Sequence, residues 1–152
     1  MMRHSDGFDL SRFLPYLLNQ AAEETSRSFA GIYRDEFGIS RTQWRVMANL
    51  GRFGPMTARD ICRISLIEKT KVSRAVSGLV TRSYLRKDPS EHDRRAEILS
   101  LTGEGAEVYG ALGARALAFE KALCLRLGPD RAEEMRVLLR LLCAAPDPAL
   151  RG

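Results

Sequence analysis

The segment KTKVSRAVSGLVTRSYLRKDPSEHDRRAEILSLT, residues 69–102, contains two patterns with different periods. Its first part places apolar residues at three- and four-residue steps, which is typical of one buried face of a helix. Its second part holds two short runs, 84–87 and 96–101, separated by a polar turn that contains Pro89; this predicts two strands joined as a hairpin. The apolar helix residues are Val72, Ala75, Val76, Leu79 and Val80.

Two helix starts precede this segment. Ser40-Arg-Thr-Gln43 has the spacing of a capping box, in which the hydroxyl accepts from a free backbone N–H and Gln43 reaches back. Thr57-Ala-Arg-Asp60 has the same spacing, with Asp in place of the usual Glu or Gln. We therefore expect one helix ending near Phe53 and a short second helix with Ile61 and Ile64 inward. A turn at 65–67 would then lead into the helix that begins at Lys69.

Apolar helices flank this region on both sides. A three- and four-residue pattern predicts a helix from Leu14 to Glu36, with Pro15 in its first turn and Gly38 closing it. Thr102 is the expected N-cap of a helix that runs to Leu127, and a last helix carries Met135, Leu138, Leu139 and Leu142. The fold class is therefore mainly α.

Helix, short helix, turn, helix and two-stranded hairpin is the order of a winged helix-turn-helix. A helix after a tight turn can enter the DNA major groove with its first residues at the base edges. The candidates in this reading helix, residues 69–82, are Lys69, Thr70, Lys71, Ser73 and Arg74. Arg and Lys suit guanine, and hydroxyl groups suit phosphates or either kind of base. The alternative is a solvated basic helix surface, with Arg74 held in an ion pair.

Charge along the chain supports a polyanionic partner. Residues 52–95 hold eleven Lys and Arg against five Asp and Glu, a net charge of +6 in a chain whose total is +5. A basic stretch between near-neutral flanks favours nucleic acid over other partners. The hairpin, or wing, carries Asp93, Arg94 and Arg95 at its tip. Arg95 could enter a narrow minor groove, with Asp93 as a brace that directs its guanidinium; the alternative is a solvated turn with a surface ion pair.

These patterns resemble the MarR family of bacterial transcriptional regulators over nearly the whole chain. The matching runs are FGISRTQWRVMANL, TARDICRIS and the segment from Lys69 to Gly105. The wing motif Asp-x-Arg followed by Leu-x-Leu-Thr-x-x-Gly starts at Asp93. The resemblance implies that Arg82 and Arg86 contact phosphates. The chain departs from the family at position 83, where it has Ser and the family often has Gly. A left-handed turn at this position would strain Ser more than Gly.

The flanking helices predict a homodimer. A winged helix-turn-helix at residues 38–102 does not need three more apolar helices, so residues 10–37 and 103–145 are expected to form a helical dimerisation region. A two-fold dimer places two reading helices ~34–36 Å apart, one turn of DNA. The resemblance implies the same arrangement on a palindromic promoter site. The alternative is an intramolecular bundle in a monomer.

The remaining expectations concern ligands and location. The resemblance implies that a small, often aromatic and anionic effector releases the DNA. Tyr16, Asn19, Trp44 and Met47 could line a pocket for it. The alternative is that Trp44 and Met47 are simply core residues. We expect no cofactor, no metal site, no membrane span, no enzymatic activity and a cytoplasmic location. Cys62, Cys124 and Cys143 are expected to be buried structural thiols. The alternative function is a winged-helix protein-interaction module that does not bind DNA.

Overall fold

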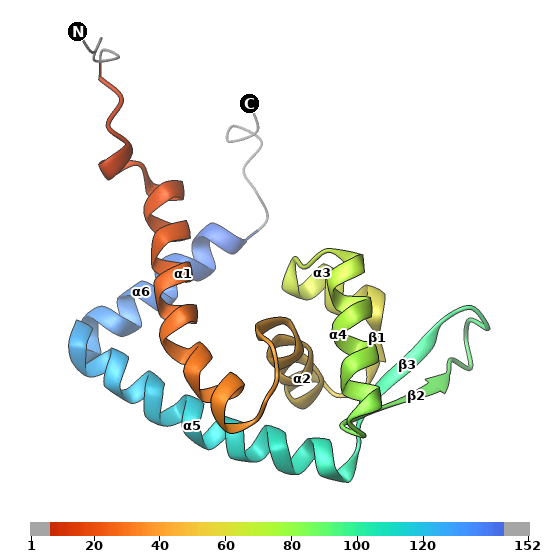
Figure 1. The fold of residues 1–152 in the computed structure, drawn as a ribbon. Coiled ribbons are helices and arrows are strands. Elements are labelled where there is room, and N and C mark those ends of the chain that lie inside the picture. The colour runs from red at the N-terminus through yellow and green to blue at the C-terminus, as the bar shows by residue number, and fades with distance from the viewer. Residues whose placement is uncertain (1–6, 145–152) are drawn as a thin grey trace, which may run out of the picture. The chain divides into compact units, whose positions relative to one another are not determined.

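The computed structural model describes residues 7–144, which form two compact units that divide after Gly113, inside one helix (Figure 1). The mainly helical fold class and the winged helix-turn-helix order are confirmed. In chain order the elements of the first unit are a 3-10 turn (Leu10–Arg12), α1 (Leu14–Gly31), α2 (Arg41–Phe53), β1 (Met56–Thr57), α3 (Ala58–Ser65), α4 (Lys69–Thr81), β2 (Leu85–Pro89), β3 (Glu97–Leu101) and the start of α5 (Gly103–Leu127). The second unit holds the rest of α5 and α6 (Pro129–Cys143).

The first helix has the predicted extent but changes its winding. α1 continues without a break into a π-helical turn, Ile32–Glu36, so the helical run covers 14–36. Gly38 has a φ of +64°, and its N–H donates to the carbonyl of Arg34, so it ends the helix as predicted. This turn directs the chain into α2.

Both predicted capping boxes are present. The Ser40 hydroxyl accepts from the Gln43 backbone N–H at 3.1 Å, and the Gln43 side chain accepts from the Ser40 backbone N–H at 2.8 Å. At the second box, Thr57 Oγ1 accepts from the Asp60 backbone N–H at 3.1 Å, and the Asp60 carboxylate accepts from the Thr57 N–H at 3.2 Å. The shorter Asp side chain therefore completes the box as Glu or Gln would.

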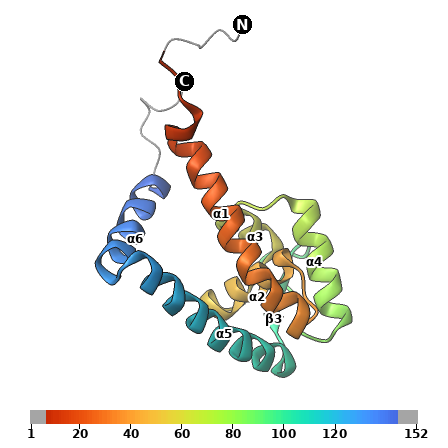
Figure 2. The same ribbon diagram turned by 60° about the vertical axis from the view of Figure 1, so that its left-hand side comes forward.

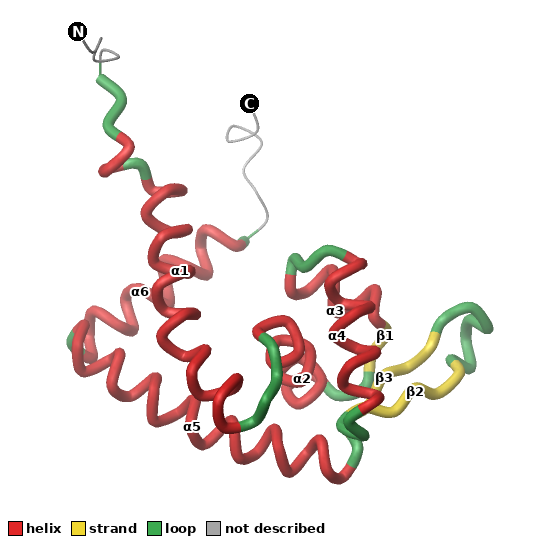
Figure 3. The backbone as a smooth tube through the Cα atoms, viewed as in Figure 1, coloured by secondary structure: helices red, strands yellow, loops and turns green. Residues whose placement is uncertain are grey.

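The wing is part of a three-stranded antiparallel sheet in the order β1-β3-β2 (Figure 3). The two residues of β1 pair with β3, Met56 opposite Leu99, and this strand was not predicted because it is too short to show a period. Pro89 was expected in the turn; it instead ends β2, opposite Glu97. Leu99, on the central strand, is buried and fastens the wing to the helices.

The core of the first unit lies among α2, α3, α4 and the sheet (Figure 2). Ile61 is fully buried as predicted, but Ile64 is 43% exposed, so its predicted inward position is wrong. The buried face of α3 runs through Ile61 and Ser65, four residues apart, and Ile64 lies to one side of it. Residues buried to 1% exposure or less include Ile39, Val46, Met47, Val72, Leu79 and Leu112.

One junction joins the wing to α4 and α5. Ser83 has a φ of +63°, the left-handed conformation that the family resemblance suggested for this position. The Thr102 hydroxyl donates to the Ser83 carbonyl and accepts from the backbone N–H of Gly105 at 3.0 Å, so it caps α5 as predicted. A Cβ at Gly105 would collide with the carbonyl of Tyr84. The Thr-x-x-Gly part of the wing motif is thus explained by close packing.

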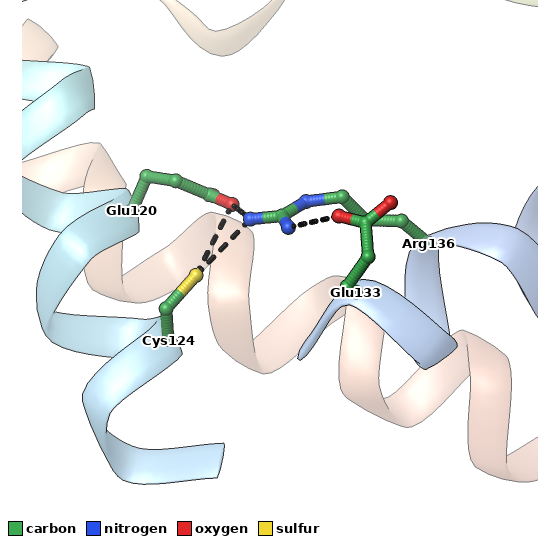
Figure 4. A network of polar contacts seen from close by, with 4 residues as sticks. All are labelled: Glu120, Cys124, Glu133 and Arg136. Carbon is green, nitrogen blue, oxygen red and sulfur yellow. Dashed lines mark hydrogen bonds and ion pairs between the residues drawn. The ribbon is translucent and has the colours of Figure 1, made fainter. Parts of the chain in front are cut away.

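In the second unit, Arg136 on α6 bonds to Glu120 and Cys124 on α5 and to Glu133 on its own helix (Figure 4). Its guanidinium donates to Glu120 at 2.6 Å, to Glu133 at 2.8 Å and to the sulfur of Cys124 at 3.1 Å. Hydrogen bonding from Arg136 is the main cause that lowers the pKa of Glu120. In residues 7–144, no helix is both long enough and apolar enough to span a bilayer.

Candidate nucleic-acid interface

The five candidates on the reading helix share one exposed face of α4. Val72, Ala75, Val76 and Leu79 turn toward the core, and this leaves the first two turns of the opposite face to solvent. A shallow hollow on this face is lined by four of the predicted residues and by Ser77, one turn further along. The five candidates, all exposed, are Lys69, Thr70, Lys71, Ser73 and Arg74.

Arg74 is not held in an ion pair in the described residues, so that alternative is wrong. Within residues 7–144, neither Lys69, Lys71 nor Arg74 lies within ion-pair distance of a carboxylate. Three uncompensated cations thus occupy the start of one helix. Such an arrangement raises the local positive potential and favours a polyanion.

The tip of the wing is ordered by Asp93, although not in the predicted way. One carboxylate oxygen of Asp93 accepts from the backbone N–H of Arg95 at 2.9 Å. Its carbonyl accepts from the N–H of Ala96 at 3.0 Å. The expectation that Asp93 directs the guanidinium is therefore replaced by a brace on the backbone. Arg94 and Arg95 are both exposed.

The two predicted phosphate-binding arginines already have partners inside the protein. Arg82 Nη1 donates to the carbonyl of Gly38 at 2.7 Å, and its guanidinium lies 4.8 Å from the centre of the Tyr84 ring. Arg86 Nε donates to Asp88 at 2.8 Å. Arg82 thus has a structural contact 44 positions away in the sequence, which no local pattern could indicate.

Two cations that the sequence did not single out lie near the wing. Arg59, at the start of α3, and Lys87, on β2, line a groove together with Ser73 and Arg95. Arg59 follows the Thr57 cap by two residues, and this position on the first turn of a helix was the signal available in the sequence. Lys87 lies 3.8 Å from Glu97 on the paired strand.

The predicted effector pocket does not form from the four residues named for it. A pocket of about 320 Å³ lies where α1 and its π-helical turn meet α2, and Trp44 is the one predicted residue that lines it. Met47 is fully buried core, and Tyr16 and Asn19 are exposed on earlier turns of α1. The residues lining the pocket are Ser26, Phe29, Tyr33, Arg41, Trp44 and Arg45.

This pocket combines aromatic rings with two arginines. The Trp44 ring lies 5.7 Å from Phe29 and 6.4 Å from Tyr109. Arg45 Nη2 donates to the carbonyl of Ser65 at 2.6 Å, and Arg41 pairs with Glu23 at 3.1 Å. Burial, and then the charge of Arg41, lower the pKa of Arg45. The negative charge of a bound anion would favour the charged form of Arg45.

No group of three or more His, Cys, Asp or Glu residues is placed to hold a metal ion in residues 7–144. The expected burial of the three cysteines is wrong for Cys143, which is exposed near the end of α6, while Cys62 and Cys124 are partly buried.

Comparison with known proteins finds similarity to transcriptional regulators. Residues 37–96 match the model of the MarR family. The chain is 26% identical over 132 residues to YwoH of Bacillus subtilis (strain 168), described as an uncharacterized HTH-type transcriptional regulator; the match covers 87% of this chain and 95% of YwoH.

Solved structures agree with this match. The MarR family transcriptional regulator SPO1453 of Silicibacter pomeroyi DSS-3 superposes with a TM-score of 0.78 at 29% identity, over 90% of this chain and 96% of that one. Bordetella bronchiseptica BpsR, whose DNA binding is described as regulated by 6-hydroxynicotinic acid, superposes with a TM-score of 0.79 over 91% of this chain and 99% of its own. At 19% identity, BpsR shows a shared fold alone.

Proposed function

We propose that this chain is a homodimeric repressor of the MarR family of winged-helix transcriptional regulators, and that it binds a palindromic promoter site in duplex DNA. The observation that carries the proposal is the exposed face of α4, where Lys69, Lys71 and Arg74 have no carboxylate partner in the described residues. Arg and Lys at the start of such a helix suit guanine edges in the major groove. Arg95 would enter the adjacent minor groove, and Arg94 would contact its phosphates.

The dimer is supported by apolar side chains left in solvent. On α1, Leu14 is 63% exposed and Leu17 is 42% exposed; on α6, Leu138 is 53% exposed and Leu141 is 67% exposed. Rows of exposed leucines of this kind are typical of protein–protein contacts. We propose that residues 10–37 and 103–144 pair two copies, and that 38–102 binds DNA; residue 145 of the expected range lies outside the described residues. A cytoplasmic location follows from the proposed partner.

An aromatic carboxylate is the effector that the pocket beside Trp44 fits. Phe29 and Trp44 would stack on the ring, and Arg41 and Arg45 would bind the acid group. The lining residues come from α1, its π-helical turn and α2, and α2 packs against the reading helix α4. A ligand there would therefore fix the position of α1 relative to the helices that carry the DNA-binding face. We propose that this lowers the affinity of the dimer for its operator.

The deciding experiment selects bound duplexes from a random library and measures affinity for the selected site by fluorescence anisotropy over a salt series. We expect log K to fall steeply and linearly with log salt, because bound cations release counterions from the phosphates. Lys71→Ala and Arg74→Ala should each weaken specific binding by ~1–3 kcal/mol if they touch bases. Equal losses on selected and random duplexes would make them phosphate contacts instead.

A chain that stays monomeric, or that ignores duplex DNA at low salt, would contradict the proposal. The second of these results would favour the alternative of a protein-interaction module. In that case the exposed face of α4 would bind an acidic protein surface, and charge reversal at Lys71 would abolish that contact.

A further inference from the structure

We propose that the groove between α3, α4 and the wing holds a phosphate of the DNA backbone, and that Arg59 is the residue that binds it. The inference rests on the proposed function, because it requires that α4 and the wing occupy neighbouring grooves of one duplex. It assigns a role to a residue that lies outside both the reading helix and the wing.

The groove is formed by three elements that are distant in the sequence. It has a volume of about 360 Å³ and is open to solvent. Its walls come from the start of α3, from the second turn of α4 and from both strands of the wing with the turn between them. Its polar lining includes Thr57, Arg59, Ser73, Lys87, Arg95 and Glu97.

The charges in the groove divide into paired and unpaired groups. Lys87 lies 3.8 Å from Glu97, and the Asp93 carboxylate accepts from the backbone N–H of Arg95. The side chains of Arg59 and Arg95 have no carboxylate partner within residues 7–144. The unpaired guanidinium of Arg59 and the Ser73 hydroxyl therefore line one groove next to Arg95, and guanidinium and hydroxyl groups bind phosphate oxygens.

The path of the DNA explains why a phosphate should come here. The major and minor grooves of a duplex are separated by one sugar–phosphate strand. If α4 lies in the major groove and Arg95 in the next minor groove, that strand must cross between α4 and the wing. The groove lined by Arg59 and Ser73 is the space between these two elements. A phosphate contact there would set the distance between the reading helix and the wing tip.

The test compares Arg59→Ala with Arg63→Ala on a 30-base-pair duplex of random sequence and on the selected operator. Arg63 is the matched control, because it lies on the same helix, is exposed, does not line the groove and pairs with Asp60 at 3.4 Å. Anisotropy titrations from about 50 to 200 mM salt give the slope of log K against log salt. Each lost phosphate contact should make this slope shallower by about 0.9. The loss of affinity between the lowest and the highest salt concentration would then be smaller by a factor of about 3.5.

We expect Arg59→Ala to reduce the slope and to weaken both duplexes by the same factor, whereas Arg63→Ala leaves the slope unchanged. Arg59→Lys keeps the charge and should restore most of the slope, which separates lost charge from a disturbed fold. A methylphosphonate scan of the operator should find a neutral linkage that weakens the wild type but not Arg59→Ala.

The outcomes separate the inference from the proposed function. If the wild type binds duplexes steeply with salt and Arg59→Ala has the same slope, the groove does not hold a phosphate, and the proposed function stands. A loss confined to the operator would also overturn the inference, since a backbone contact acts on every sequence. If the wild type binds neither duplex, both the proposed function and the inference fail.

Discussion

Arg82→Ala distinguishes a phosphate contact from a structural one. The family resemblance implies that Arg82 faces DNA, yet its Nη1 donates to the Gly38 carbonyl at 2.7 Å and its guanidinium lies over the Tyr84 ring. These contacts join the end of α4 to the turn before α2. We therefore expect Arg82→Ala to destabilise the fold and to leave the salt dependence of DNA binding unchanged.

The size of the effect follows from the lost contacts to Gly38 and Tyr84. Arg82 Nη2 also donates to the Tyr84 hydroxyl at 3.2 Å, and this bond is counted together with the ring contact as one interaction with Tyr84. A hydrogen bond with a charged donor contributes about 1.5–3 kcal/mol, and a cation–π contact at an exposed site about 0.5–1 kcal/mol. Because Arg82 is exposed, the lower ends apply, which gives a loss of about 2 kcal/mol. For a chain of this length, that corresponds to a decrease in Tm of roughly 4–8 °C.

Thermal unfolding followed by circular dichroism measures this shift, with all variants at one protein concentration because a dimer links Tm to concentration. Arg86→Ala is the control, since its partner Asp88 lies in the same exposed strand and the pair contributes only ~0–1 kcal/mol. An unchanged Tm for Arg82→Ala, together with a smaller salt slope, would refute the structural role and restore the phosphate contact.

The other predictions concern the wing, its hinge, the dimer and acid stability. Arg95→Ala should weaken operator binding by ~1–3 kcal/mol without changing Tm; unchanged affinity in anisotropy titrations would remove the wing from the mechanism. Ser83→Gly should raise Tm by a few degrees in a thermal melt, because it relieves a left-handed conformation that strains Ser by about 1 kcal/mol; a lower Tm would mean that the Ser side chain outweighs this strain. Leu138→Asp should convert the dimer to monomer in light scattering, whereas Arg131→Glu on the same helix should not; a Leu138→Asp dimer would place the interface elsewhere. Glu120 has a folded pKa below its usual range, so its contribution to stability is present above the unfolded pKa of about 4.3 and is lost as pH falls through the folded value. Glu120→Gln should therefore lower Tm at pH 7 and match the wild type near pH 2; a constant difference would exclude the Arg136 contact as the cause.

Local signals predicted most of the elements correctly. The capping boxes at Ser40 and Thr57 and the Thr102 cap depend on residues that lie within a few positions of one another, so the sequence alone reveals them. The left-handed conformation of Ser83 was suggested only by the family resemblance. The exposed face of α4 also follows from local periodicity. β1 was missed because a strand of two residues exists only through its pairing with Leu99.

The candidate site residues also divide into those that a local sequence pattern identifies and those that only the folded structure brings together. Lys71 and Arg74 could be named from the sequence, because the buried stripe of one helix determines which side chains face outward. The sequence places Arg59 on the first turn of α3, but it does not place Arg59 in a groove, because that groove also needs α4 and the wing. The pocket beside Trp44 likewise draws its second wall from Phe29, far earlier in the chain.

The sequence by itself determined where the helices and wing strands lie and which side of each is apolar, because the backbone periods of 3.6 and 2.0 and the caps act over one or two turns. Only the tertiary structure decided that Arg82 binds Gly38, that Ile64 remains in solvent, and that Arg59 and Arg95 share a groove. Those outcomes depend on contacts between residues that are distant in the chain, and chain packing brings such residues together without a local signal in either one.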